Sequence, residues 1–95
     1  MAYRFSEQAT LDGYALYEAS LKQFGLRAAD RYFTIMLAAA QFAADNPLLS
    51  PERTQTPIRV RVRYFGAHLL VYQIVDDDIV IRRVFHQSQD WAEFL

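Results

Sequence analysis

The first half of the chain alternates hydrophobic and polar residues with the period of an α-helix. Between residues 7 and 24, apolar side chains recur every three or four positions, which places them on one side of a helix. Ser6 is a suitable N-cap, Glu7 falls in the first turn, and Gly25 follows where helices often end in a left-handed residue. We therefore predict a helix over residues 7–24 with an inner face made of Leu11, Tyr14, Tyr17 or Leu16, Leu21 and Phe24.

A second helix is predicted over residues 26–45. Its repeated alanines allow another helix to approach closely, and Asn46 and Pro47 end it, because proline disfavours helical geometry in the residue before it. Two long helices with so short a connection must be antiparallel neighbours, so the pattern predicts an αα-hairpin. The expected inner face of the second helix holds Ala28, Tyr32, Ile35, Met36, Ala39 and Phe42 or Ala43.

Two shorter segments flank this hairpin. "YRF" at residues 3–5 places Tyr3 and Phe5 on one side and Arg4 on the other, which is typical of a short strand. "NPLLSPERTQTP", from residue 46 to 57, contains three prolines and several polar residues, and we expect it to form a surface loop.

The second half of the chain changes to a period of two. Strands are predicted over residues 58–64, 67–75 and 79–86, separated by turns at Phe65–Gly66 and at the three aspartates 76–78. No further ligands cluster near these aspartates, so a solvated turn is favoured over a metal site. The predicted fold class is α+β: a short N-terminal strand and an antiparallel αα-hairpin packed on a small, mainly antiparallel β-sheet, followed by a short C-terminal helical segment.

These turns fix an expected strand register and two faces of the sheet. The expected pairs are Arg63 with His68, Arg61 with Leu70, Arg59 with Tyr72, Tyr72 with Arg82, Leu70 with Val84, and His68 with His86. One face then carries Val60, Val62, Leu69, Val71, Val75, Ile79, Ile81 and Phe85, and we expect the helix hairpin to cover it. The opposite, cationic face collects Arg59, Arg61, Arg63, His68, Tyr72, Arg82 and His86 beside Leu70, Ile74 and Val84. Arg83 falls on the helix-covered face, where its charge must either snorkel to the surface or find a carboxylate partner, unless it lies at the sheet edge or the register differs.

Composition limits the possible functions. The chain of 95 residues is expected to form one domain over 1–95, and it has no cysteine, which excludes a disulfide framework, a thiolate metal site and a cysteine nucleophile. No apolar stretch reaches the length of a membrane span, and we expect a cytoplasmic protein without a cofactor or metal. The net charge of −1 argues against nucleic-acid binding by the chain alone, although five of its nine arginines lie between residues 59 and 83.

The order of these elements resembles the RelE/ParE superfamily of toxins from type II toxin–antitoxin pairs. The similarity is strongest to the ParE branch. It rests on the junction between the predicted helices, with Phe24, Gly25, Ala28 and Tyr32, on the strand "GAHLLVYQI", and on the ending "IVIRRVFHQSQDW". One departure concerns Ser88 and Gln89, where ParE-like proteins often carry an arginine and a methionine just before the aspartate. This change bears on the strength or the target preference of any toxic activity.

The resemblance implies a toxin that binds DNA gyrase and stalls it with cleaved DNA, and that a ParD-like antitoxin holds inactive in a hetero-oligomer. RelE-like relatives on the same fold instead cut messenger RNA at the ribosome, and a non-toxic partner-binding module is a further alternative. Fold alone does not choose among these functions.

The candidate site residues differ between these functions. A nuclease would use His86 as general acid or base and Arg61, Arg63 and Arg82 to stabilise phosphate charge. Without catalysis, His86 is expected to end its strand hydrogen-bonded to the C-terminal segment. Binding of a target or an antitoxin would use Arg59, Arg61, Arg63, His68, Tyr72, Arg82, His86 and Trp91.

Overall fold

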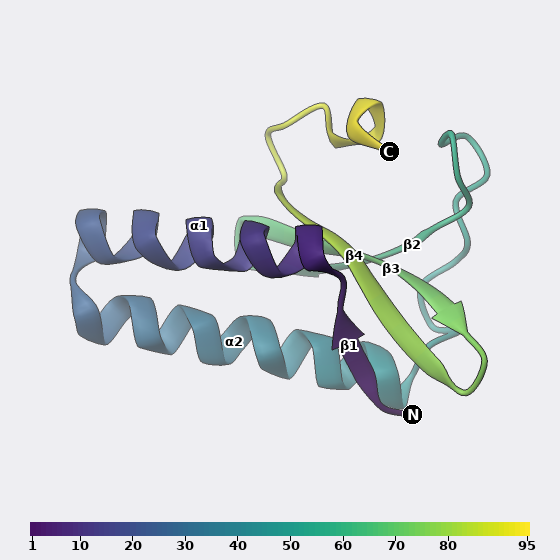
Figure 1. Ribbon diagram of the computed structural model, residues 1–95, viewed down its shortest axis with the longest axis horizontal. Coiled ribbons are helices and arrows are strands. Elements are labelled where there is room, and N and C mark those ends of the chain that lie inside the picture. Colours follow the sequence, from purple (N-terminus) through teal and green to yellow (C-terminus); the bar gives the residue numbers. More distant parts are fainter.

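The computed structural model describes all residues, 1–95, and confirms the α+β class. Two antiparallel helices pack on a four-stranded mixed sheet, and a short 3-10 turn ends the chain (Figure 1). Neither helix combines the length and the apolar character needed to cross a membrane. The elements in chain order are β1 (Tyr3–Phe5), α1 (Glu7–Phe24), α2 (Leu26–Asp45), β2 (Arg61–Phe65), β3 (His68–Val75), β4 (Asp78–His86) and η1 (Trp91–Phe94).

Both helices begin and end where the sequence predicts. Ser6 caps α1 by accepting a hydrogen bond from the Ala9 amide at 3.1 Å, and Gly25 joins the helices with a φ of 88°. The predicted inner face of α1 is wrong, because Leu11, Tyr14 and most of its other large side chains are exposed. The buried positions are instead small, which lets α1 approach α2 and the sheet closely; they are Ala9, Gly13 and Ser20, with Leu16 half-buried.

The inner face of α2 is also dominated by small residues. Met36, Ala39 and Ala43 are buried as predicted, whereas Ile35 and Phe42 are exposed. Ala29, Ala40 and Ala44 complete the buried face. The helix pair therefore contributes a shallow surface, and the large apolar side chains that fill this core come mainly from the sheet.

The sheet has the strand order β1-β4-β3-β2, with β1 parallel to β4 and the other pairs antiparallel. The first hairpin turns at Gly66 and Ala67, so Phe65 pairs with His68 and the predicted register of β2 is wrong by two residues. Gly66 has a φ of 51°, a conformation that few other residues adopt readily. Since a shift of two residues preserves the side-chain alternation, the facing groups are unchanged, and Arg61 pairs with Tyr72 rather than Leu70.

The second hairpin follows the predicted register only in part. His68 pairs with His86, and Leu70 pairs with Val84, as expected. An irregularity between Val71 and Tyr72 then inserts an extra residue into β4, so Tyr72 pairs with Ile81 and not with Arg82. This β-bulge reverses the predicted face assignment for the part of β4 before it.

The helices cover the face that was predicted to be open. Buried Leu70, Tyr72 and Val84 pack with Ile79, Ile81 and the small residues of the helices. The opposite face carries Val60, Val62, Leu69, Val71 and Phe85, and the C-terminal residues Trp91 and Leu95 pack on it. The sheet is therefore apolar at its centre on both sides. The predicted division into one apolar, helix-covered face and one cationic face is wrong.

Candidate functional site

The basic residues of the predicted cationic face do not form one open surface. Arg59 is exposed and lies 3.6 Å from Glu52, whereas the Arg61 guanidinium donates to the Ser50 carbonyl at 2.7 Å. The buried Tyr72 hydroxyl donates to the Pro47 carbonyl at 3.0 Å. Arg61 and Tyr72 thus bind the loop after α2 to the sheet, so both side chains have a structural role.

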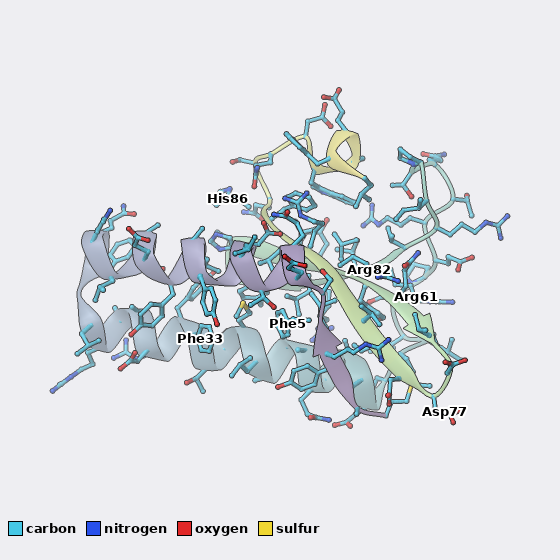
Figure 2. All side chains as sticks on the ribbon, in the orientation of Figure 1. Phe5, Phe33, Arg61, Asp77, Arg82 and His86 are labelled. Atoms are coloured by element: carbon cyan, nitrogen blue, oxygen red, sulfur yellow. The ribbon has the colours of Figure 1, made fainter.

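Arg63 and Arg82 have other partners and lie on opposite faces of the sheet. The Arg63 guanidinium lies 4.0 Å from the ring centroid of Phe42 on α2, and its buried Nε has no hydrogen-bond partner. The Arg82 Nε donates to Gln73 at 2.8 Å on the face opposite the helices. Figure 2 shows Arg61 and Arg82 near the loops and the Asp77 turn, away from His86.

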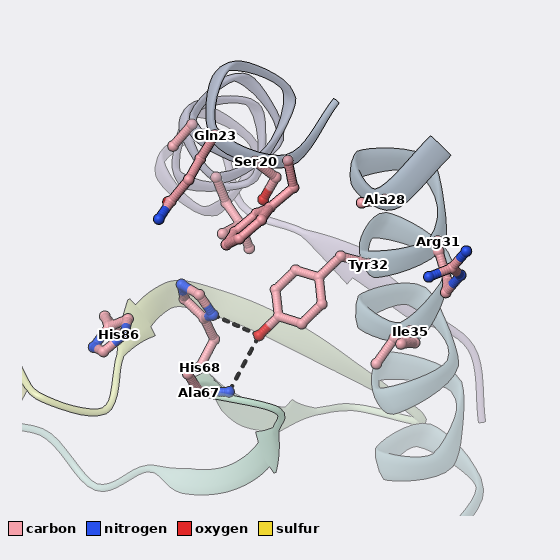
Figure 3. Close-up of a pocket in the computed structure, with 12 residues that line it drawn as sticks. Ser20, Gln23, Ala28, Arg31, Tyr32, Ile35, Ala67, His68 and His86 are labelled. Carbon is pink, nitrogen blue, oxygen red and sulfur yellow. Dashed lines mark hydrogen bonds between the residues drawn. The ribbon is translucent and has the colours of Figure 1, made fainter. Parts of the chain in front are cut away.

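Two predicted site residues do meet, at the end of the sheet beneath the helix hairpin. The rings of His68 and His86, which are cross-strand partners, lie 4.9 Å apart in an edge-on arrangement. Tyr32 of α2 joins them, because its hydroxyl lies 2.6 Å from the Nδ1 of His68 and accepts from the Ala67 amide at 3.2 Å (Figure 3). The sequence placed Tyr32 on the inner face of α2 but carried no signal for this contact.

Burial changes the proton affinity of this cluster. Desolvation lowers the pKa of His68 below its ordinary value, and the neighbouring charge of His86 lowers it further. Desolvation also raises the pKa of Tyr32, an effect that the hydrogen bond from the Ala67 amide partly offsets. At neutral pH the cluster therefore holds a neutral His68 and a protonated Tyr32 hydroxyl.

His86 is fixed by the segment that follows it, as its non-catalytic interpretation predicts. Its Nδ1 accepts from the Ser88 amide at 3.0 Å, and the Ser88 hydroxyl lies 2.7 Å from the same atom. Gln89 in turn accepts from the His86 amide at 2.8 Å. Ser88 and Gln89, the departure from the ParE-like pattern, are therefore the residues that hold the end of β4 and orient this ring.

A cleft opens above the two histidines, between the hairpin tip and the end of the sheet. Its volume is about 630 Å³. Figure 3 shows Gln23 and Ser20 of α1 above the histidines and Tyr32 between α2 and His68. The lining consists of Leu16, Ala19, Ser20, Gln23, Phe24, Ala28, Arg31, Tyr32, Ile35, Ala67, His68 and His86.

Arg83 and Trp91 also have defined partners. The Arg83 guanidinium forms an ion pair with Asp12 of α1 at 2.8 Å, so of the two predicted alternatives it finds a carboxylate. Its predicted place on the helix-covered face is wrong, because Arg83 pairs with Val71 on the opposite face. The same carboxylate accepts from the Val84 amide at 2.9 Å. Trp91 stacks on Phe85, and the guanidinium of Arg53 lies 5.4 Å from its ring centroid.

This arrangement favours binding of an anion or an amphipathic segment at the cleft. Arg31 supplies donors only, the other polar side chains of the lining can both donate and accept, and none of the lining residues is acidic. No group of three or more histidine, cysteine, aspartate or glutamate residues is placed to hold a metal ion. The aspartates 76–78 lie in and beside the β3–β4 turn.

The sequence of the chain matches the family described as the ParE toxin of the type II toxin–antitoxin system, parDE, over residues 3–91. Among solved structures, the fold is similar to one described as the chromosomal ParDE toxin–antitoxin system from P. aeruginosa. That similarity has a TM-score of 0.75 at 15% sequence identity and covers 90% of this chain and 95% of that chain. No curated protein matches the sequence. At such low identity the structural similarity concerns the fold alone.

Proposed function

The chain belongs to the ParE toxin family of type II toxin–antitoxin systems, and from this membership we propose that it inhibits DNA gyrase by binding and that a ParD-like antitoxin holds it inactive. The family match over residues 3–91 is the observation that carries the proposal. The protein would act in the cytoplasm, where gyrase and DNA are found, and would be stored there as a toxin–antitoxin hetero-oligomer.

The positions of the candidate catalytic residues support binding rather than phosphodiester cleavage. Cleavage through His86 needs a cationic side chain beside the same phosphate. Arg61 is instead bonded to the Ser50 carbonyl and Arg82 to Gln73, and the Arg63 guanidinium rests on Phe42. The four residues that a nuclease would need are thus committed to separate structural contacts.

The outer surface of the helix hairpin supports a protein partner. Large apolar side chains are exposed along α1 and at the start of α2, which is unusual for a surface that stays in water. These residues are Leu11, Tyr14, Leu21, Phe24 and Leu26. An amphipathic antitoxin segment would cover such a surface and keep the toxin soluble.

The experiment that tests this function is induction of the protein alone and together with the product of the adjacent reading frame. Alone, it should slow growth and activate the DNA-damage response while bulk messenger RNA stays intact. The purified protein should inhibit supercoiling by gyrase and accumulate cleaved DNA. Growth should recover when the antitoxin is co-expressed. Normal supercoiling in the presence of an excess of folded protein would overturn the gyrase assignment.

The second candidate is a ribosome-dependent endoribonuclease, favoured by the contact among Tyr32, His68 and His86. If this cluster transferred protons, His86→Gln would lower the cleavage rate by about 10²- to 10⁴-fold while binding survived. Mapping of transcript ends after induction separates the candidates, because only the nuclease yields rapid cuts in ribosome-bound messages. A folded protein with no effect on growth, gyrase or transcripts would indicate the non-toxic partner-binding module.

A further inference from the structure

The cleft beneath the hairpin tip differs chemically from the remaining surface. Apolar Leu16, Phe24 and Ile35 share its lining with the two histidines of the chain, and the only charged side chain in the lining is Arg31. In Figure 3 Gln23 points toward the histidines, whereas Arg31 lies on the far side of α2. An apolar pocket with two imidazole rings at its floor suits a ligand that is partly apolar and partly anionic, because an imidazole N–H can donate to an anion.

The two histidines each present one free ring nitrogen. His86 uses Nδ1 to accept from the Ser88 amide, so the neutral ring carries its proton on Nε2. His68 uses Nδ1 in its contact with the Tyr32 hydroxyl. The Nε2 atoms of two rings 4.9 Å apart thus remain without a protein partner.

The surroundings contain no free negative charge that would satisfy these nitrogens. Tyr32 and Arg31 contribute to the lining from α2, with Arg31 on the far side of that helix from the histidines (Figure 3). A second groove of about 300 Å³ shares both histidines and is lined by Asp12 from α1 and Arg83 from β4. The Asp12 carboxylate is already bonded to Arg83 and to the Val84 amide, so it does not neutralise the histidines.

We propose that this cleft binds an antitoxin segment that carries an aspartate or glutamate next to apolar residues, with the carboxylate held by His68 and His86. The inference rests on the proposed function, since it names the surface that the antitoxin would occupy. A peptide fits better than a nucleic acid, because one arginine and a net charge of −1 offer little neutralisation of phosphates.

Binding of the carboxylate should be coupled to uptake of a proton. In the free protein, burial and the charge of His86 keep the pKa of His68 low and the ring neutral. A carboxylate beside the ring favours its charged form and raises that pKa. The complex then binds a proton that the free toxin lacks, and affinity increases up to about tenfold for each unit by which pH falls through the window between the two pKa values.

The test is calorimetric titration of the toxin with the ParD-like antitoxin encoded by the adjacent reading frame, from about pH 8 to pH 6. Repeating the titration in two buffers with different protonation enthalpies measures the protons taken up. We expect uptake approaching one proton and a rise in affinity of about three- to tenfold per pH unit. In His68→Gln the proton uptake and the pH dependence of the affinity should both disappear. This result would show that the proton binds to His68 and not to a titrating group of the antitoxin.

A pair of matched variants tests the apolar wall independently of the histidines. Phe24 lines the cleft and is 67% exposed, whereas Leu48 lies in the loop after α2, is 71% exposed and does not line the cleft. Phe24→Ser should weaken antitoxin binding by about tenfold or more, and Leu48→Ser by less than about threefold. Both side chains are solvent-exposed, so both variants should fold normally.

The outcomes separate this inference from the proposed function. If the antitoxin binds tightly, without proton uptake and equally to parent and Phe24→Ser, the cleft is the wrong surface and the toxin–antitoxin pairing stands. If the antitoxin does not bind at all, the inference and the antitoxin partner both fail. If a single-stranded oligonucleotide binds the parent toxin but not the Phe24→Ser variant, the cleft binds a phosphate ligand and the proposed peptide ligand is wrong.

Discussion

The hydrogen bond between Tyr32 and His68 joins residues that are far apart in the chain, at a distance of 2.6 Å. The Tyr32 hydroxyl also accepts from the Ala67 amide, so one side chain of α2 holds both the β2–β3 turn and the histidine. Phe65 packs against the rings of both residues. At the scale of single residues, the position of His68 and its proton affinity therefore have the same cause, which is burial under α2.

Lowering the pH should destabilise the free protein through His68. Its folded-state pKa lies below the ordinary value of about 6.5, so between these two values the unfolded chain binds a proton that the folded chain does not. This contribution to the free energy of unfolding is complete above about pH 6.5 and is lost as the pH falls from there toward the folded-state pKa. Thermal melts from about pH 7.5 to 5.5 should show a smaller decline for His68→Gln, which cannot titrate. Equal slopes for parent and variant would show that His68 is not the group responsible.

At the scale of secondary-structure elements, α1 is attached to the sheet through Asp12. The carboxylate binds the Arg83 guanidinium at 2.8 and 3.2 Å and the Val84 amide at 2.9 Å. These contacts lie on β4 beyond the residues that pair with β1, where the strand has no neighbouring strand on that side. The Asp12 carboxylate thus accepts the hydrogen bond of the Val84 amide, which would otherwise be unpaired at the edge of β4.

Asp12→Ala should lower the free energy of unfolding by about 2 to 3 kcal/mol, because it leaves a part-buried guanidinium and a strand amide without their acceptor. Urea denaturation measures the loss. The control is Glu18→Ala on the same helix, whose exposed ion pair with Lys22 is worth at most about 0.5 kcal/mol. Similar losses in both variants would mean that helix propensity, and not the contact with β4, dominates.

Two glycines give a further contrast at this scale. Gly13 lies inside α1, where an alanine Cβ would rest 3.5 Å from the Met36 side chain, in ordinary contact. Gly13→Ala should therefore stabilise the protein by about 0.5 to 1 kcal/mol through helix propensity. At Gly66 the Cβ would lie 2.6 Å from the Tyr32 hydroxyl, with φ at 51°, and alanine should cost about 1 to 3 kcal/mol. The same urea titration measures both changes, and a stabilised Gly66→Ala would contradict the close approach of Tyr32.

How far the sequence predicts these elements depends on whether the determinants are local. The helices begin and end as predicted because Ser6, Gly25 and Pro47 act on their own neighbours. In the first hairpin Gly66 takes the first, not the second, position of the turn. The turn therefore lies one residue later than predicted, and the pairing of β2 with β3 differs from the prediction by two residues. The cross-strand histidine pair was predictable from the strands, whereas the contact of His68 with Tyr32 required the packing of α2 on the sheet.

The same dependence on non-local packing explains why the helices were predicted to cover the wrong face of the sheet. Alternation assigns Leu70 and Val84 to one side and Leu69 and Val71 to the other, but both sides are apolar at the centre of the sheet. The pattern then fixes which residues share a face without fixing which face the helices cover. The polar side chains of the helix-covered face lie at its margins, where their charge is not buried without a partner. Arg61 reaches the loop after α2, and His86 reaches the cleft.

At the scale of the whole molecule, the sheet separates two apolar cores. The larger core lies beneath the helices, and Trp91 and Leu95, which follow β4, pack on the smaller one. A chain of about 100 residues buries a limited fraction of its surface, so the second core is a substantial part of its stability. In Figure 1 the C-terminal turn lies on the side of the sheet away from α2, which agrees with this division.

Trp91 was predicted as a binding residue, and its contacts predict a structural role that can be measured. It packs on the second core, stacks on Phe85 with ring centroids 6.3 Å apart, and carries Arg53 over its ring. Trp91→Ala should remove about 1 to 3 kcal/mol, less than for a fully buried tryptophan, which lowers the melting temperature by roughly 5 to 20 °C in a domain of this size. Phe94, which is more exposed but also touches Phe85, is the matched control, and Phe94→Ala should cost less.

Two measurements on Trp91→Ala separate stability from recognition. If the side chain only closes the core, the variant melts early but binds the antitoxin with unchanged affinity at temperatures where it is folded. If the melting temperature is unchanged and the affinity for antitoxin or gyrase falls, Trp91 belongs to an interface and the second core does not depend on it. The first outcome is expected, because the indole contacts residues from both the loop before β2 and the end of β4 and thereby joins the two ends of the segment that forms most of the sheet.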